Sequence, residues 1–271
     1  MDKAMNSRSI EGERIARLIK QWLDNKELKI ISLDSCDSTN SVAAEYAQNG
    51  ACEFTTVISS SQSAGRGRLG RSFFSPENTG LYMSMILRPG TKATNALGIT
   101  TLAAVATANV IKRYSDKRIG IKWVNDIYAD NKKVCGILTT GSVNSATGDL
   151  SYAILGIGVN LFMPKDGFPE DIRDTASSVF DRPYDTELKA EFVSGLINEL
   201  LCLYPMLGEK GIVEKYRDLS IIPGHDIFVL SGDEKLPAKA ISVGDDYSLL
   251  VRFENGSLKA LNTGDISIRL K

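Results

Sequence analysis

The feature that most limits the fold of this chain is a series of hairpin-like segments that follows one apolar helix. Residues 95–114 are apolar and rich in Ala and Thr, which predicts a buried helix. Three β-like runs come next, at 119–128, 133–139 and 150–161. The turn residues Asp130-Asn131 join the first two runs, and a polar loop over 141–149 joins the last two. Consecutive hairpins favour antiparallel pairing over βαβ alternation. We therefore expect an α+β fold with a mixed or antiparallel sheet flanked by helices.

The remaining periodic segments predict further elements and a second, smaller unit. Helices are expected over 10–24, from Ser38 to Asn49-Gly50, and over 186–207, and strands at 29–34, 54–60 and 81–87. After Pro223-Gly224 the pattern changes to short alternating runs at 226–231, 236–243, 247–253 and 257–261. This spacing predicts a small all-β barrel. We expect two domains: residues 1–220, in which 1–28 form an N-terminal helical extension, and residues 221–271.

Composition excludes several classes of function. The 271 residues include 32 basic and 33 acidic side chains, so no global basic field attracts nucleic acid. The single histidine, His225, lies in a Pro-Gly-His-Asp turn signal, which argues against Ser-His-Asp hydrolases and histidine-rich zinc sites. No apolar stretch suits a signal peptide or a bilayer span, which predicts a cytoplasmic protein. The four cysteines have no CxxC or zinc spacing and are interpreted as small buried thiols: Cys36, Cys52, Cys135 and Cys202.

The most unusual stretch is the loop Gly65–Arg71, which reads Gly-Arg-Gly-Arg-Leu-Gly-Arg. Its glycines match GxGxxG, but a dinucleotide fingerprint needs a helix next, and here Phe73-Phe74-Ser75-Pro76 follow. The glycines allow a ligand to approach the backbone closely, and guanidinium groups match phosphate and carboxylate oxygens. From the residues alone two interpretations stay open: a loop that closes over a polyanion, and a solvated basic loop.

Three other stretches are candidates for the same site. Lys122–Asp126 ends a predicted strand, and its Asp126 could hold Mg²⁺ while Asn125 reads a base edge. The alternative is a hairpin with an exposed end. Ser38-Thr39-Asn40 alone indicates a helix N-cap, and Gly156–Asn160 could be a strand with glycines for close packing.

Taken together, these stretches resemble the biotin protein ligase family. Gly65–Arg71 is similar to its GRGRxGR loop and Lys122–Asp126 to its KWPND signature, with Val124 in place of the proline. Valine suits a strand, so we expect altered local rigidity there. Further matches in order and spacing are Ser38-Thr39-Asn40, Gln62, Lys133–Leu138, Gly158-Val159-Asn160 and Gly264–Arg269. The resemblance covers roughly 30–271. It implies a class II synthetase-like catalytic domain and an SH3-like C-terminal β-barrel.

The resemblance also implies roles for individual residues. Lys133 is the first choice for the catalytic lysine, aided by Arg68 and Lys122. By match of position, biotin is expected to contact Ser38, Thr39, Asn40, Gln62, Arg66, Gly67, Arg68, Lys133 and Gly136. ATP is expected to contact Arg66, Arg68, Arg71, Phe73, Lys122, Asn125 and Asn160, with Asp126 near Mg²⁺.

The implied activity is ATP-dependent formation of biotinyl-5′-AMP, followed by transfer of biotin to a lysine of a biotin carboxyl carrier protein. About thirty residues before the catalytic domain are too few for a winged helix-turn-helix, so a monofunctional ligase without DNA or membrane contacts is expected. The resemblance leaves open whether two copies of the chain form a homodimer. The nearest rival is a lipoate or octanoate ligase. A biotin-sensing regulator would need a DNA-reading element, and a nucleic-acid-binding barrel would need a basic, aromatic-rich face.

Overall fold

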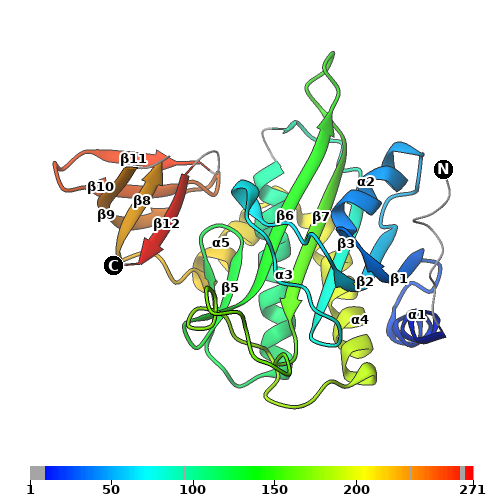
Figure 1. The fold of residues 1–271 in the computed structure, drawn as a ribbon. Coiled ribbons are helices and arrows are strands. Elements are labelled where there is room, and N and C mark those ends of the chain that lie inside the picture. The colour runs from blue at the N-terminus through cyan, green and yellow to red at the C-terminus, as the bar shows by residue number, and fades with distance from the viewer. Residues whose placement is uncertain (1–9, 94–95, 232–233, 263–265, 271) are drawn as a thin grey trace.

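We analysed a computed structural model of the chain, which describes residues 10–93, 96–231, 234–262 and 266–270. The main body is a seven-stranded mixed sheet with the order β1-β2-β3-β7-β6-β5-β4 (Figure 1). Its strands are β1 Ile30–Cys36, β2 Thr56–Gln62, β3 Gly80–Leu87, β4 Ile119–Lys122, β5 Asp126–Ala129, β6 Lys132–Val143 and β7 Leu150–Asn160. Strands β1 and β2 pair in parallel, and every other neighbouring pair is antiparallel. The predicted α+β class is confirmed.

Helices cover both faces of this sheet unequally. The α-helices among the described residues are α1 Ile10–Trp22, α2 Thr39–Gln48, α3 Ala96–Tyr114, α4 Thr186–Leu203 and α5 Lys210–Leu219. Helices α3 and α4 lie behind the sheet, where they bury Leu81, Met83, Leu155 and Ile157 in the large core (Figure 1). On the other face α2 covers only β1, β2, β3 and β7, through a small cluster around Ala43 and Ala47. Successive side chains of a strand point to opposite faces of the sheet, so every second residue of β4 to β6 projects on the part of this face that α2 leaves uncovered. These residues can form a site.

The chain ends in a separate five-stranded antiparallel sheet, as the alternating pattern predicted. Its order is β11-β10-β9-β8-β12, and it lies to one side of the main sheet, beyond α5 (Figure 1). The strands are β8 Asp226–Ser231, β9 Glu234–Val243, β10 Leu249–Phe253, β11 Leu258–Leu261 and β12 Ile266–Leu270. Strand β12 was not predicted as a strand, and the Gly264-Asp265 pair of the matched C-terminal ending lies outside the described residues. The division at residues 220 and 221 stays a prediction.

Several local expectations need correction. The predicted run 119–128 is two strands, β4 and β5, because the chain turns at residues 123–125. Val124 therefore lies in a turn and not in a strand, after a cis Trp123–Val124 peptide bond. The helix predicted over 186–207 ends at Leu203, where a 3₁₀ turn with Pro205 follows. Helix α5 was missed, although its buried residues Ile212, Val213, Tyr216 and Leu219 recur at helical spacing.

The cysteines and the chain ahead of β1 also need comment. Only Cys135 is buried; Cys36 is half-buried, and Cys52 and Cys202 are exposed, so the buried-thiol interpretation is wrong for two of the four. Helix α1 is the one helix between residue 10 and β1, and whether a DNA-reading element exists stays a prediction. Across the described residues, no helix is long and apolar enough to cross a membrane.

Candidate active site

The floor of the site is a row of residues that crosses five strands. Pairing places Tyr82 of β3 opposite Gly158 of β7, Gly158 opposite Gly136 of β6, Gly136 opposite Asp126 of β5, and Asp126 opposite Lys122 of β4. Residues opposite one another project on the same face of a sheet. The two central positions are glycines, so the middle of the row has no side chains. The result is a trough with a tyrosine at one end and charged groups at the other.

The neutral end of the trough is a hydrogen-bond network around the first turn of α2. The Thr39 amide donates to Gln62 Oε1 at 2.8 Å, and the Thr39 hydroxyl donates to the same oxygen at 3.1 Å. Ser84 Oγ lies 2.8 Å from Thr39 Oγ1 and 2.5 Å from Asn40 Oδ1. The Asn40 amide nitrogen is buried and has no partner among the described residues. Since burying an amide donor without a hydrogen bond is costly, this end is built to bind a polar, uncharged group.

The glycine next in the floor fixes the place of Asn40. Gly156 pairs with Ser84 on one side and Leu138 on the other. A Cβ atom at Gly156 would overlap the Asn40 side-chain amide, so only glycine leaves Asn40 its position. Ser38 stands at the N-cap of α2, but its side chain makes no capping hydrogen bond. The sequence indicated an ordinary N-cap at Ser38, but the first helical amide, that of Thr39, is bound by Gln62 Oε1 instead.

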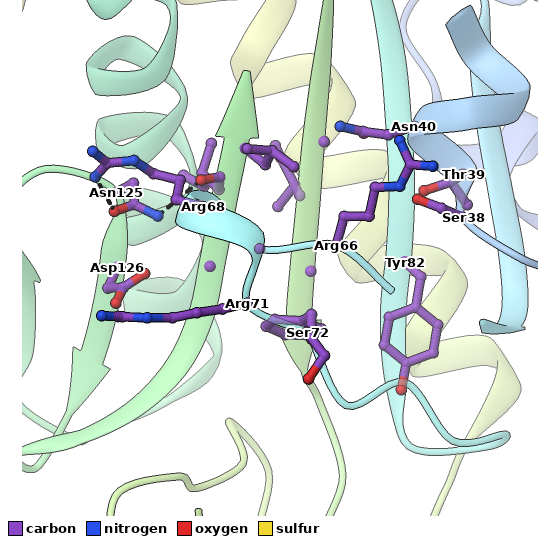
Figure 2. Close-up of a pocket in the computed structure, with 18 of the residues that line it drawn as sticks. Ser38, Thr39, Asn40, Arg66, Arg68, Arg71, Ser72, Tyr82, Asn125 and Asp126 are labelled. Atoms are coloured by element: carbon purple, nitrogen blue, oxygen red, sulfur yellow. Dashed lines mark hydrogen bonds between the residues drawn. The ribbon is translucent and has the colours of Figure 1, made fainter. Parts of the chain in front are cut away.

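The Gly/Arg loop closes over this floor as a compact turn. The Gly67 amide donates to Arg71 O at 2.7 Å, and the Arg71 amide donates to Arg68 O at 3.2 Å. Leu69 and Gly70 have φ values of 55° and 70°, in the left-handed region that glycine enters without strain. Figure 2 shows Arg66 directed toward the first residues of α2, while Arg68 and Arg71 extend toward the charged end. The loop therefore spreads its cations along the whole trough.

One arginine of the loop is tied to the turn between β4 and β5. Arg68 Nη1 donates to Asn125 Oδ1 at 3.0 Å, and Asn125 Nδ2 donates to Ile137 O at 2.9 Å (Figure 2). Burial lowers the pKa of the Arg68 guanidinium, and the nearby Asp126 carboxylate acts in the opposite sense. A guanidinium keeps its charge throughout the physiological range. The contact places a partly desolvated cation above the floor.

Two lysines complete the charged end. Lys133 Nζ forms an ion pair with Asp126 Oδ1 at 2.7 Å. Lys122 Nζ lies 3.4 Å from the Tyr128 hydroxyl and 5.4 Å from the centre of its ring. The backbone of Lys133 is fixed by the segment 175–177, through its amide to Thr175 O at 2.7 Å and its carbonyl to Ser177 N at 2.9 Å. Cations at both sides of a single carboxylate leave net positive charge for an anionic ligand.

Thirteen of the residues predicted for the site by sequence, together with Asp126, line one cleft. They are Ser38, Thr39, Asn40, Gln62, Arg66, Gly67, Arg68, Arg71, Phe73, Lys122, Asn125, Lys133 and Gly136. Asn160 does not line it, because its amide donates to Ser177 O at 3.1 Å and so supports the segment beside Lys133. Its contact with adenine stays a prediction.

Sequence reasoning missed the lining residue Tyr82 and assigned no role to Gly156 and Gly158. The stretch that contains the two glycines was a candidate for the site, with close packing as the other interpretation. Their period-two spacing in Gly156-Ile157-Gly158 was the available signal, because it places both on one face of β7. Tyr82 had no such signal. Its buried hydroxyl donates to Pro76 O at 2.9 Å, so the ring stands as the fixed end wall of the trough.

Comparison with known proteins decides the family. A model described as the biotin/lipoate A/B protein ligase family matches residues 33–160. The bifunctional ligase/repressor BirA of Bacillus spizizenii is 31% identical over 245 residues, which are 88% of this chain and 74% of that protein. The chain belongs to the biotin protein ligase family. Among other family members, the biotin–[acetyl-CoA-carboxylase] ligase of Paracoccus denitrificans is 36% identical over 127 residues, 46% of this chain and 51% of that ligase.

A solved biotin protein ligase shares the fold. The structure from Aquifex aeolicus, in complex with biotin and ATP, matches with a TM-score of 0.75 and covers 90% of this chain and 99% of its own. The identity is 24%, so this likeness supports the fold and not the individual site residues.

Proposed function

We propose that this chain adenylates biotin with ATP in the trough and transfers the biotinyl group to a lysine of a biotin carboxyl carrier protein. The observation that carries the proposal is the polarity of the cleft. One end offers uncharged hydrogen-bond groups around Asn40, and the other gathers Arg68, Lys122 and Lys133. Biotin has the same polarity, with a neutral ureido ring at one end and a carboxylate at the other.

The neutral end is assigned to the ureido ring. Asn40 Nδ2 supplies a buried donor in need of a partner, and Thr39 and Gln62 are oriented by mutual hydrogen bonds. Ser38 and Arg66 lie beside Thr39 at this end and also line the cleft (Figure 2). The Phe73 ring packs directly on the floor, since a Cβ atom at Gly158 would lie 2.6 Å from its edge and one at Gly136 would lie 3.4 Å from it. The bicyclic ring of biotin is therefore assigned to the space beside Phe73, toward Asn40.

The charged end is assigned to the carboxylate and the phosphates. A carboxylate oxygen of biotin attacks the α-phosphorus of ATP, a P–O bond breaks, and pyrophosphate leaves. In this proposal Lys133 holds the attacking carboxylate, and Lys122, Arg68 and Arg71 neutralise the phosphates. In the second step the carrier amine attacks the mixed anhydride, loses a proton and releases AMP. Preformed cations and exclusion of water serve both steps.

Mg²⁺ fits this site only as an ion carried by the nucleotide. Across the described residues there is no cluster of three or more His, Cys, Asp or Glu side chains placed to hold a metal ion. Asp126 is the one carboxylate of the lining, and it already pairs with Lys133. Mg²⁺ commonly binds through one or two carboxylates and the phosphates of its nucleotide, so Asp126 would be its protein ligand. When bound, the ion reduces the charge of the triphosphate.

The proposal is tested by ATP–pyrophosphate exchange with purified protein and biotin, lipoate or octanoate as the acid. We expect exchange with biotin alone, followed by labelling of a carboxylase carrier domain in the full reaction. Exchange with lipoate or octanoate would instead identify the chain as a lipoate or octanoate ligase. Folded protein that gives no exchange with any of the three acids would overturn the proposal.

A further inference from the structure

Helix α5 places a buried tyrosine hydroxyl directly behind the charged end of the trough. The Tyr216 side chain is fully buried, and its hydroxyl donates to Val124 O at 3.1 Å. Val124 is itself buried in the turn between β4 and β5. Burial raises the pKa of Tyr216, so its hydroxyl stays a donor at any physiological pH. An unpaired buried carbonyl is costly, so this hydrogen bond fixes the turn from one side.

The C-terminal sheet holds the same turn from a second direction. Trp123 Nε1 donates to Tyr247 O at 2.9 Å, in a buried contact between residues far apart in the sequence. The rings of Tyr216 and Tyr247 meet edge to face, with centroids 6.0 Å apart. Arg217, next to Tyr216, donates to Val243 O and pairs with Asp245 at 2.6 Å. Helix α5 and the turn after β9 therefore form one unit behind the residues 123–124.

Every predicted phosphate or base contact on β4 and β5 is adjacent to that turn. Lys122 precedes it, Asn125 is its last residue and accepts the hydrogen bond from Arg68, and Asp126 follows it. A shift of the turn would move these groups together. The first turn of α2, which forms the neutral end, instead rests on β2, β3 and β7 through Gln62, Ser84 and Gly156. The two ends of the trough thus have separate supports.

We propose that Tyr216 is a positioning residue for the nucleotide half of the site, acting through the Val124 carbonyl on the neighbouring Asn125. The inference rests on the proposed adenylation of biotin and adds which half of the reaction the tyrosine serves. It predicts that loss of the hydroxyl weakens use of ATP and leaves use of biotin unchanged. A purely structural role would lower stability without separating the two substrates.

The test compares Tyr216→Phe with a matched variant, Tyr204→Phe. Tyr204 also donates its hydroxyl behind the sheet, to Glu53 Oε1 at 2.9 Å, but it has no contact with the turn. In ATP–pyrophosphate exchange we expect Tyr216→Phe to raise KM for ATP roughly tenfold, the size that one hydrogen bond supplies, and to change KM for biotin less than twofold. Tyr204→Phe is expected to leave both constants at the wild-type values.

A second variant and a binding measurement keep the inference separable from the proposed function. Trp123→Phe removes the donor to Tyr247 O, and it is expected to raise KM for ATP in the same selective way. Calorimetric titration of each folded variant with ATP and with biotin is expected to show the same split without turnover. Equal losses for both substrates, or a wild-type KM for ATP in Tyr216→Phe, would refute the positioning role. A wild-type chain that binds biotin and ATP but gives no exchange would refute the proposed function alone; one that binds neither would refute both.

Discussion

Replacing Gly158 by alanine tests whether the side-chain-free floor is essential. A Cβ atom at this position would lie 2.6 Å from Phe73 Cε1 and 2.8 Å from Phe73 Cζ. Carbon atoms pack best at about 3.5–4.0 Å, so the ring must retreat by about 1 Å. The backbone of Phe73 cannot absorb this freely, because its amide donates to Gly65 O at 2.8 Å and so closes the base of the Gly/Arg loop.

The expected effect on catalysis follows from that displacement. A misplacement of about 1 Å in a group that positions a reacting substrate can cost about 10²-fold in rate, equivalent to about 2.7 kcal/mol of activation free energy. We therefore expect kcat/KM for biotin-dependent ATP–pyrophosphate exchange to fall about 10²-fold in Gly158→Ala. Because β7 is extended at this residue, alanine is compatible with the backbone, and the thermal midpoint is expected to change little.

Two controls separate this mechanism from a general loss of structure. Gly195→Ala lies in α4, where the nearest atom to a new Cβ is Tyr114 Oη at 3.8 Å, so it is expected to raise stability by about 1 kcal/mol and leave exchange unchanged. Phe73→Leu in the Gly158→Ala background removes the ring edge and is expected to recover part of the lost activity. Exchange within threefold of wild type in Gly158→Ala would refute the reasoning.

Three further predictions concern single groups. Lys133→Gln is expected to lower exchange at least 10²-fold by removing the proposed carboxylate contact, while urea unfolding changes by less than about 1 kcal/mol because the ion pair with Asp126 is partly exposed. Arg68→Gly is expected to release the adenylate, so that bystander proteins are biotinylated and recovered in a pull-down. Asn125→Ala removes the 3.0 Å contact to Arg68 and is expected to have the same effect more weakly. Labelling at the wild-type level in Arg68→Gly would contradict the role of Arg68. Burial raises the pKa of Cys135, so its thiol is expected to resist a disulfide reagent in native protein at pH 8, whereas the exposed Cys202 reacts.

The sequence was informative where chemistry is local to a short segment. The Gly65–Arg71 loop and Lys122–Asp126 keep their cations and glycines within a few residues, so their place in the site could be inferred before any fold was known. The fold class followed from the hairpin turns. Asp130 and Asn131, for example, have φ values of 46° and 67°, as a tight hairpin turn requires.

What could not be predicted depends on pairing between distant segments. That Tyr82, Gly158 and Gly136 share one row is a matter of strand register, which a single strand does not encode. The support of Val124 by Tyr216 joins residues 92 positions apart. The hydrogen bond from Asn160 to Ser177 could not be predicted for the same reason, because Ser177 lies on a segment with no periodic pattern.

The bare floor of the trough also limits how the cleft could be redesigned. Gly136, Gly156 and Gly158 have no side chain to shorten, so a larger acid cannot be admitted by trimming the floor. New volume must come from the end wall or the lid, at Tyr82 or Phe73. Of these, Tyr82 is the harder to change, since its hydroxyl belongs to a buried hydrogen-bond network with Thr79 Oγ1 and Pro76 O that its removal would disrupt. Engineering for bulkier biotin analogues should therefore begin at Phe73.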